Sequence, residues 1–182
     1  MPNRMNETVP LSLRRMILGL VSGSLVGLLS YTVLEAGTDL LTQLIAFRFF
    51  GFEWSEPYFF EMVGVYLLFG TPAALVFGLV IGLPVWKVAE DRPLRSKRSA
   101  LVYGSITGSL IGLILLLLGL VAGLQTFLDD TSSYDSYSFG YQVTKDGLPT
   151  ALGWLLQLKM LLFFFAAGAL GGIVARLVAV RR

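Results

Sequence analysis

Four long apolar runs dominate the chain, and short polar segments separate them. The runs cover approximately residues 16–34, 59–85, 100–124 and 154–180. Each exceeds the roughly 18 residues that indicate a membrane-spanning helix. Strands of a membrane barrel would instead alternate apolar and polar residues over segments of about ten. The pattern therefore predicts an all-α integral membrane protein with four transmembrane helices, which form a single membrane domain over residues 1–182.

A weaker pattern follows the first apolar run, in residues 35–56. Asp39, Thr42 and Gln43 are spaced to lie on one face of a helix, and apolar residues occupy most of the opposite face. Aromatic residues gather near the end of this segment, where they suit the lipid headgroup boundary. We therefore expect a short amphipathic helix that lies in the membrane interface. A re-entrant segment is the alternative structure for these residues.

Glycine recurs at every fourth position in the first and third runs. The two triplets are 85 positions apart and consist of Gly19, Gly23, Gly27, Gly104, Gly108 and Gly112. Glycines at this spacing share one helix face, which leaves a groove where a second helix can approach closely. Gly78 and Gly82 repeat the spacing in the second run. We expect helix packing of the glycine-zipper kind, with Gly23 and Gly108 at or near the closest crossings.

The recurrence also indicates an internal duplication of a helix hairpin. Both triplets contain the pattern Gly-Ser-Leu-x-Gly-Leu, and a weaker likeness relates the second run to the fourth. The repeat halves would cover about 14–86 and 97–180. Both halves would enter the membrane from the same side, so the repeat would be parallel rather than inverted. Chance is the alternative, because this spacing of small residues is common in membrane helices.

Basic residues are distributed unevenly between the polar segments. Eleven of the 14 lysines and arginines lie in residues 1–15, 87–98 and 176–182, whereas nine of the 12 acidic residues lie in the rest of the chain. Cytoplasmic segments of membrane proteins collect lysine and arginine. We therefore expect a multi-pass protein of the cell (inner) membrane, surrounded by lipid, with both termini in the cytoplasm.

The composition narrows the candidate chemistry. The chain contains no histidine and no cysteine, which removes thiolate nucleophiles, the commonest zinc ligands and the usual general base at neutral pH. Phosphate-binding loops and zinc-protease motifs are also absent from the sequence. The basic residues flank apolar runs and do not form a nucleic-acid patch. We expect no cofactor, no metal site, no nucleic-acid partner and no enzymatic activity.

Two charged residues, Glu61 and Lys159, intrude into apolar runs far from the basic ends. A charge within a membrane span is expensive, so one hypothesis is a functional ion pair or a proton- or cation-linked site. The alternative, which we favour, has Glu61 in the first turn of its helix, where the helix dipole stabilises it. Lys159 would then extend its ammonium group towards the headgroups.

The segment between the third and fourth runs is polar and acidic, and residues 131–141 are rich in serine and tyrosine. Tyr134, Tyr137 and Tyr141 could form a binding surface, because tyrosine suits positions with one apolar and one wet side. The alternative is that these side chains simply lie on the membrane surface. The second arrangement is the more common one.

Two classes of function fit these features. The first is a non-catalytic membrane subunit or accessory protein that packs against other membrane helices, either those of another protein or those of a second copy. The sparse polar chemistry and the many small-residue faces favour this class. The second is a small oligomeric transporter or channel, because some transporters are built from parallel repeats. Few polar residues are available in the runs to line a path for a solute.

Overall fold

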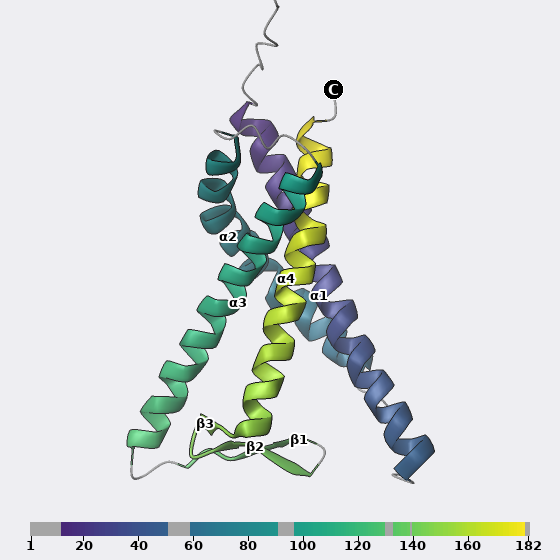
Figure 1. Cartoon of the computed structure of the whole chain (residues 1–182), viewed down its shortest axis with the longest axis vertical. Helices are drawn as coiled ribbons and strands as arrows, with labels where there is room; N and C mark the ends of the chain where they lie inside the picture. The colour runs from purple at the N-terminus through teal and green to yellow at the C-terminus, as the bar shows by residue number, and fades with distance from the viewer. Residues whose placement is uncertain (1–11, 51–58, 91–96, 130–132, 139, 181–182) are drawn as a thin grey trace, which may run out of the picture.

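The computed structural model consists almost entirely of four long helices (Figure 1). It describes residues 12–50, 59–90, 97–129, 133–138 and 140–180. The helices are α1 (Leu13–Phe50), α2 (Phe59–Glu90), α3 (Lys97–Leu128) and α4 (Ala151–Val180). All four are long and apolar enough to cross a membrane, as the apolar runs predict. The chain is therefore an all-α protein of the multi-pass membrane type.

The start of α1 and the end of α4 lie at the same end of the bundle, which we call the terminal end (Figure 1). The end of α2 and the start of α3 lie at this end too, whereas a small β-sheet marks the opposite, or sheet, end. This arrangement agrees with an even number of spans. The assignment of the terminal end to the cytoplasm of an inner membrane stays a prediction from the charge distribution.

Helix α1 differs in extent from the first apolar run. It continues through Glu35 to Phe50 without interruption, so the described part of segment 35–56 belongs to α1 and forms no separate helix. No proline interrupts this stretch, and the hydroxyl of Thr42 donates a hydrogen bond to the carbonyl of Thr38 one turn earlier. The 38 residues of α1 correspond to roughly 57 Å, well beyond a 30 Å hydrocarbon core. Residues 51–56 lie outside the described part of the chain.

Helix α4 occupies the centre of the bundle, between α1 and α3 (Figure 1). Its buried residues are all small: Gly153, Ala167, Gly171, Ala175 and Ala179. Lipid tails are as apolar as leucine, so burial of apolar surface does not drive helices together in a membrane. Close van der Waals contact does so instead, and small side chains permit it. Two neighbouring helices can therefore approach α4 closely.

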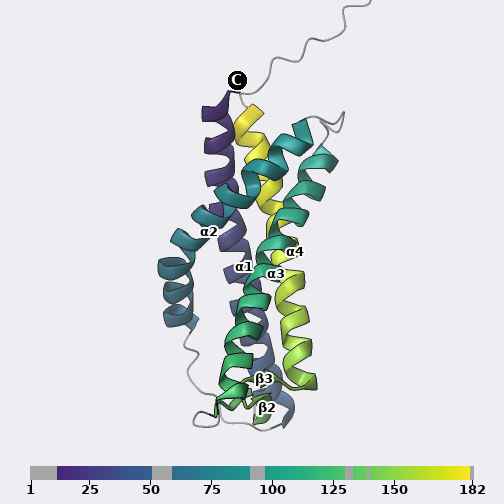
Figure 2. The same cartoon turned by 90° about the vertical axis from the view of Figure 1, so that its left-hand side faces the viewer.

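Helix α2 packs mainly against α1 and makes far fewer contacts with α3 (Figure 2). It contains Pro72 and Pro84, and Figure 2 shows it changing direction along its length. Proline removes a backbone hydrogen bond and clashes with the preceding turn, so it bends a helix. The predicted repeat would make α2 equivalent to α4, but the two helices occupy different places in the bundle. The duplication stays a prediction.

The segment between α3 and α4 contains three short strands that the sequence analysis did not predict. They are β1 (Ser136–Ser138), β2 (Tyr141–Lys145) and β3 (Leu148–Pro149), in the antiparallel order β1-β2-β3. Asp146 and Gly147 connect the last two with positive φ angles of 49° and 83°. Positive φ at both central residues is typical of a type I′ hairpin turn, for which Asp-Gly is a favoured sequence. Residues 131, 132 and 139 of the serine- and tyrosine-rich segment lie outside the described part of the chain.

Candidate functional site

The glycine triplets of α1 and α3 both pack against α4. A Cβ atom added to Gly23 would lie 2.6 Å from the carbonyl oxygen of Gly171. A Cβ atom added to Gly108 would overlap the carbonyl oxygen of Phe164 and would lie 2.9 Å from the Cα of Gly168. Side chains do not tolerate such distances to backbone atoms, so both contacts require glycine. In the structure, Gly23 and Gly108 therefore both lie against α4.

The other members of the triplets show that these contacts loosen towards the sheet end. Gly19 and Gly104, nearest the terminal end, also meet carbonyl oxygens of α4. A Cβ atom on Gly27 would lie 3.4 Å from the carbonyl oxygen of Ala167, which is ordinary van der Waals contact. The three atoms nearest to a Cβ atom on Gly112 are side-chain atoms of Phe164 and Leu161 in α4. The three helices are therefore closest at the terminal end.

The glycines of α2 make a different kind of contact. Gly78 faces the hydroxyl of Ser24 on α1, and a Cβ atom on Gly82 would lie 2.9 Å from a methyl group of Leu20. A side chain of α1 thus fills the space at each of these glycines. Because α2 lies on α1 and contacts α3 only sparsely, a space remains between α2 and the pair formed by α3 and α4.

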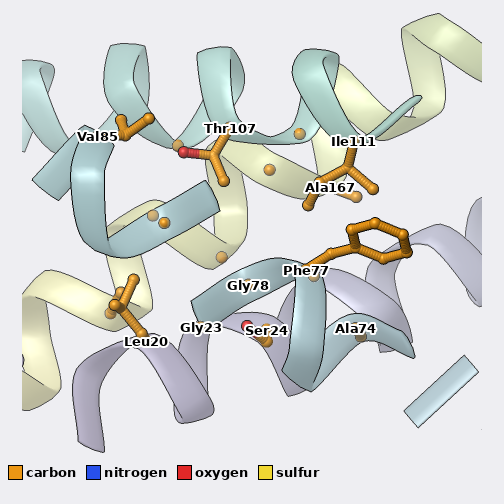
Figure 3. Close-up of a pocket in the computed structure, with 18 of the residues that line it drawn as sticks. Leu20, Gly23, Ser24, Ala74, Phe77, Gly78, Val85, Thr107, Ile111 and Ala167 are labelled. Carbon is orange, nitrogen blue, oxygen red and sulfur yellow. The ribbon is translucent and has the colours of Figure 1, made fainter. Parts of the chain in front are cut away.

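This space is a cavity of about 1050 Å³ to which all four helices contribute, and we call it the central cavity (Figure 3). Figure 3 shows Phe77 of α2, Thr107 and Ile111 of α3 and Ala167 of α4 around the same space. Pockets that bind small molecules measure about 300–1,000 Å³ and are mostly apolar. The central cavity matches the upper end of that range.

The central cavity runs along the bundle from the terminal end towards its middle. Helix α4 lines it from Met160 to Val180, which at 1.5 Å per residue is a length of roughly 30 Å. Arg15, at the start of α1, lines the cavity at the same end as Arg176. Tyr31 and Tyr66 line its inner end. The cavity is therefore cationic at one end and aromatic at the other.

The walls between these ends are mostly apolar and small. Hydroxyl groups such as those of Ser24 and Thr107 supply part of the polarity, and the Thr107 hydroxyl donates a hydrogen bond to the carbonyl of Tyr103 in its own helix at 2.9 Å. Among the described residues, no carboxylate lines the cavity. General acid–base chemistry uses a positioned proton donor or acceptor of suitable pKa, usually histidine or a carboxyl group.

A cluster of charged side chains lies beyond the aromatic end of the cavity. The ammonium nitrogen of Lys159 donates a hydrogen bond to Oε1 of Glu35 at 2.9 Å and lies 4.0 Å from Oδ1 of Asp39. It also lies 5.4 Å from the ring centre of Phe163. The side chains of Lys159 and Glu35 are 30% and 16% exposed. Charged side chains with so little exposure require partners of opposite charge, and Lys159 and Glu35 are such partners for each other.

The charge cluster continues the glycine face of α1. Tyr31, Glu35, Asp39 and Gln43 follow the triplet Gly19–Gly27 at the same four-residue spacing. Within the described part of the chain, the second carboxylate oxygen of Glu35 and the amide oxygen of Gln43 are buried without a hydrogen-bond partner. One face of α1 thus consists of glycines without side chains at the terminal end and of polar residues at the sheet end.

Aromatic rings lie between the cavity and the charge cluster. The ring of Tyr31 is 4.6 Å from that of Phe164, and it meets Tyr66 and Phe163 edge-on at 6.2 Å and 6.5 Å. Tyr31 lines the cavity and precedes Glu35 by one helical turn. Bulky rings in this layer hold α1 and α4 farther apart than the glycines do. The helices therefore diverge towards the sheet end (Figure 1).

Glu61 and Lys159, the two charged residues that intrude into the apolar runs, have different surroundings in the structure. Glu61 is exposed in the first turn of α2, whereas the carboxylate partners of Lys159 are Glu35 and Asp39 of α1. The importance of Glu35 was missed because residues 35–56 were assigned to an interfacial helix. The four-residue spacing from Tyr31 to Gln43 is a signal that would have found it. The tyrosines Tyr134, Tyr137 and Tyr141 are all exposed.

No protein-family model, no curated protein and no solved structure matches this chain.

Proposed function

We propose that this chain is a non-catalytic membrane protein with a binding role, and that it holds a hydrophobic molecule in the central cavity. The single observation that carries this proposal is the cavity of about 1050 Å³ between the four helices. Small-molecule sites are concave and mainly apolar, with a few polar groups that fix orientation. The apolar walls and the two arginines at one end have this composition.

The packing of the glycines favours a bound molecule over a partner helix. A protein partner was expected because the four spans have more glycine faces than the packing of a four-helix bundle requires. In the structure, Gly23 and Gly108 meet α4, and Gly78 meets α1, so these faces are occupied within the chain. An accessory role through another membrane protein, or through a second copy, would have to use other surfaces or the cavity itself.

Native mass spectrometry of protein purified in mild detergent tests this function. We expect lipid-sized molecules to stay bound after detergent exchange, because the cavity shelters them. Ala74→Trp introduces a large side chain into the cavity and should reduce the bound fraction at least several-fold. Val76→Trp is the matched control, because Val76 is exposed on the same helix and lies outside the cavity lining.

Three outcomes of that measurement would contradict the proposal. One is wild-type protein without any bound molecule, and another is equal retention by both tryptophan variants. The third is a protein subunit that co-elutes with the wild type and is lost from the Ala74→Trp variant, because the cavity would then hold a partner helix. Thermal unfolding of each variant shows whether the fold has survived the substitution.

The charge cluster favours a second candidate function, a small transporter. Ionisable residues within membrane spans often mark proton or ion pathways. The Glu35–Lys159 pair lies next to the aromatic end of the cavity, so a path could combine the two. Reconstitution into liposomes that contain a pH-sensitive dye would test this. A transporter that uses Glu35 would move protons and would lose flux in Glu35→Gln, whereas a binding protein would produce no flux in either form.

A further inference from the structure

The polar groups at the two ends of the central cavity are not equally available to a ligand. At the terminal end, Trp86, Ser99 and Arg176 line the cavity, and each already interacts with another group of the protein. Arg15 is exposed in the first turn of α1, where solvent can reach its charge. No charge at the terminal end therefore requires an anionic partner from a ligand, and a neutral molecule suits the cavity.

The aromatic end of the cavity has hydrogen-bond donors that a ligand can use. Tyr31 and Tyr66 line the cavity there, and both are half-buried. Among the described residues, neither of their hydroxyl groups has a hydrogen-bond partner. A hydroxyl group in apolar surroundings costs free energy while it stays unpaired. An oxygen atom of a ligand at this end can accept hydrogen bonds from these hydroxyl groups.

The same end of the cavity suits a flat ring. The ring of Tyr31 lies 4.6 Å from that of Phe164 in a tilted arrangement, and it meets the ring of Tyr66 edge-on at 6.2 Å. Phe77 of α2 also lines the cavity (Figure 3). Aromatic rings prefer offset or edge-on neighbours at such distances. A further flat ring therefore finds favourable contacts in this layer.

The length of the cavity indicates a long hydrocarbon tail. It follows α4 from Met160 to Val180 for roughly 30 Å, which equals the full thickness of the hydrocarbon core. An acyl chain of a phospholipid begins at the headgroups and fills one leaflet, about half of this thickness. Small residues of α4 between Ala167 and Ala175 line the middle of the cavity and leave room for methyl branches. An isoprenoid tail within the core therefore fits better than an acyl chain.

We infer that the central cavity binds a neutral isoprenoid lipid with a carbonyl-bearing ring, a lipid of the prenylquinone class. The ring lies in the aromatic layer, and its carbonyl oxygens accept hydrogen bonds from Tyr31 and Tyr66. The isoprenoid tail extends along α4 to the terminal end, and the sparse contact between α2 and α3 gives the lipid access from the bilayer. This inference rests on the proposed function and adds the class of the ligand and its orientation to it.

A comparison of two neutral isoprenoids tests the inference. Protein in mild detergent is mixed with equal amounts of phylloquinone and phytane, and native mass spectrometry compares the bound fractions. Both molecules have a branched isoprenoid chain, but only phylloquinone has a ring with carbonyl oxygens. We expect tighter binding of phylloquinone, and Tyr31→Phe and Tyr66→Phe should each weaken it by roughly fivefold, the contribution of one neutral hydrogen bond. Phytane binding should stay unchanged, because phenylalanine keeps the ring.

Tyr137→Phe is the matched control. It removes the same hydroxyl group from an exposed tyrosine of β1 that lies outside the cavity lining. We expect phylloquinone binding within about twofold of wild type, as for most surface substitutions. Thermal unfolding of each variant shows whether the fold has survived.

The outcomes separate the two proposals. Equal binding of phylloquinone and phytane, or an effect of Tyr137→Phe as large as that of Tyr31→Phe, would overturn the ring assignment and leave cavity binding intact. A larger loss in Tyr103→Phe, at the terminal end of the same cavity, than in Tyr31→Phe would overturn the orientation. A preference for dioleoyl phosphatidylglycerol over phylloquinone would overturn the neutral class. Binding of none of these molecules would overturn cavity binding itself, whereas Ala74→Trp should lose phylloquinone and phytane together.

Discussion

The two glycine triplets lie in similar contacts with α4, but the residues that follow them differ. In α1 the glycine face continues into Tyr31, Glu35, Asp39 and Gln43, and it ends in an ion pair with Lys159 of α4. In α3 the same spacing continues through leucines at positions 116, 120 and 124. One triplet therefore leads to a charge cluster and the other to an apolar face.

This difference shows that close packing and polar chemistry are separate features of the bundle. The glycines determine how near α1 and α3 lie to α4 at the terminal end. The side chains beyond them determine how the helices separate and what they place in the space between them. Substitutions at the glycines and substitutions in the residues beyond them should therefore affect different properties of the protein.

Gly108→Ile should cause the largest loss of stability. The new side chain would overlap the carbonyl oxygen of Phe164, so α3 would have to move away from α4. Overpacking of this kind costs about 3 kcal/mol or more and should lower both the yield and the unfolding temperature in detergent. Gly119→Ile is the control on the same helix, because nothing lies within 4 Å of a Cβ atom there. An unchanged melting profile for Gly108→Ile would contradict the packing.

Single methyl groups added to the glycines of α1 should show how the packing against α4 changes along the helix. Gly23→Ala places a Cβ atom 2.6 Å from a backbone oxygen of α4, whereas Gly27→Ala places one at 3.4 Å. We expect the first variant to lose about 1–2 kcal/mol of stability and the second to change by less than about 0.5 kcal/mol. Thermal unfolding of the two variants side by side checks this order. A larger loss for Gly27→Ala would show that the contacts tighten towards the sheet end instead.

Removal of the ammonium group tests the polar part of the α1 face. Lys159→Met should destabilise the protein by about 2 kcal/mol, because the carboxylate of Glu35 would lose its partner within the span. Adding Glu35→Gln should recover much of this loss, since the less buried Asp39 is then the only carboxyl group left in the cluster. A double-mutant cycle from unfolding in detergent gives the coupling energy. Additive effects of the two substitutions would argue against a direct pair.

Glu61→Gln should have the smallest effect. The side chain is exposed in the first turn of α2, where its interaction with the helix dipole is worth less than about 1 kcal/mol. Neither the unfolding temperature nor lipid retention should change measurably. A loss of stability comparable to that of Lys159→Met would mean that Glu61 has a partner that matters. The comparison of these two charges thus distinguishes a helix-end residue from an intramembrane pair.

The sequence predicted the helices better than it predicted the site. Long apolar runs and the four-residue glycine spacing are local patterns, so the spans could be predicted, and candidate close-packing positions named, without a structure. The partner of those positions, α4, is less evident because most of its residues that meet α1 are alanines and because Phe164 takes part in the contact with α3. The pairing of Glu35 with Lys159 depends on the continuity of α1, which the mixed composition of residues 35–50 obscured. The cavity depends on the position of α2, which no local pattern encodes.

The central place of α4 also has a consequence for biosynthesis. Helices α1 and α3 both complete their closest contacts on α4, and α4 follows them in the chain. During synthesis, the glycine face of α1 therefore stays without its contact to α4 until α4 has been inserted into the membrane. Membrane chaperones and proteases would recognise this incompletely packed form. A chain that stops before α4 should be cleared rapidly, even though three of its four spans are present.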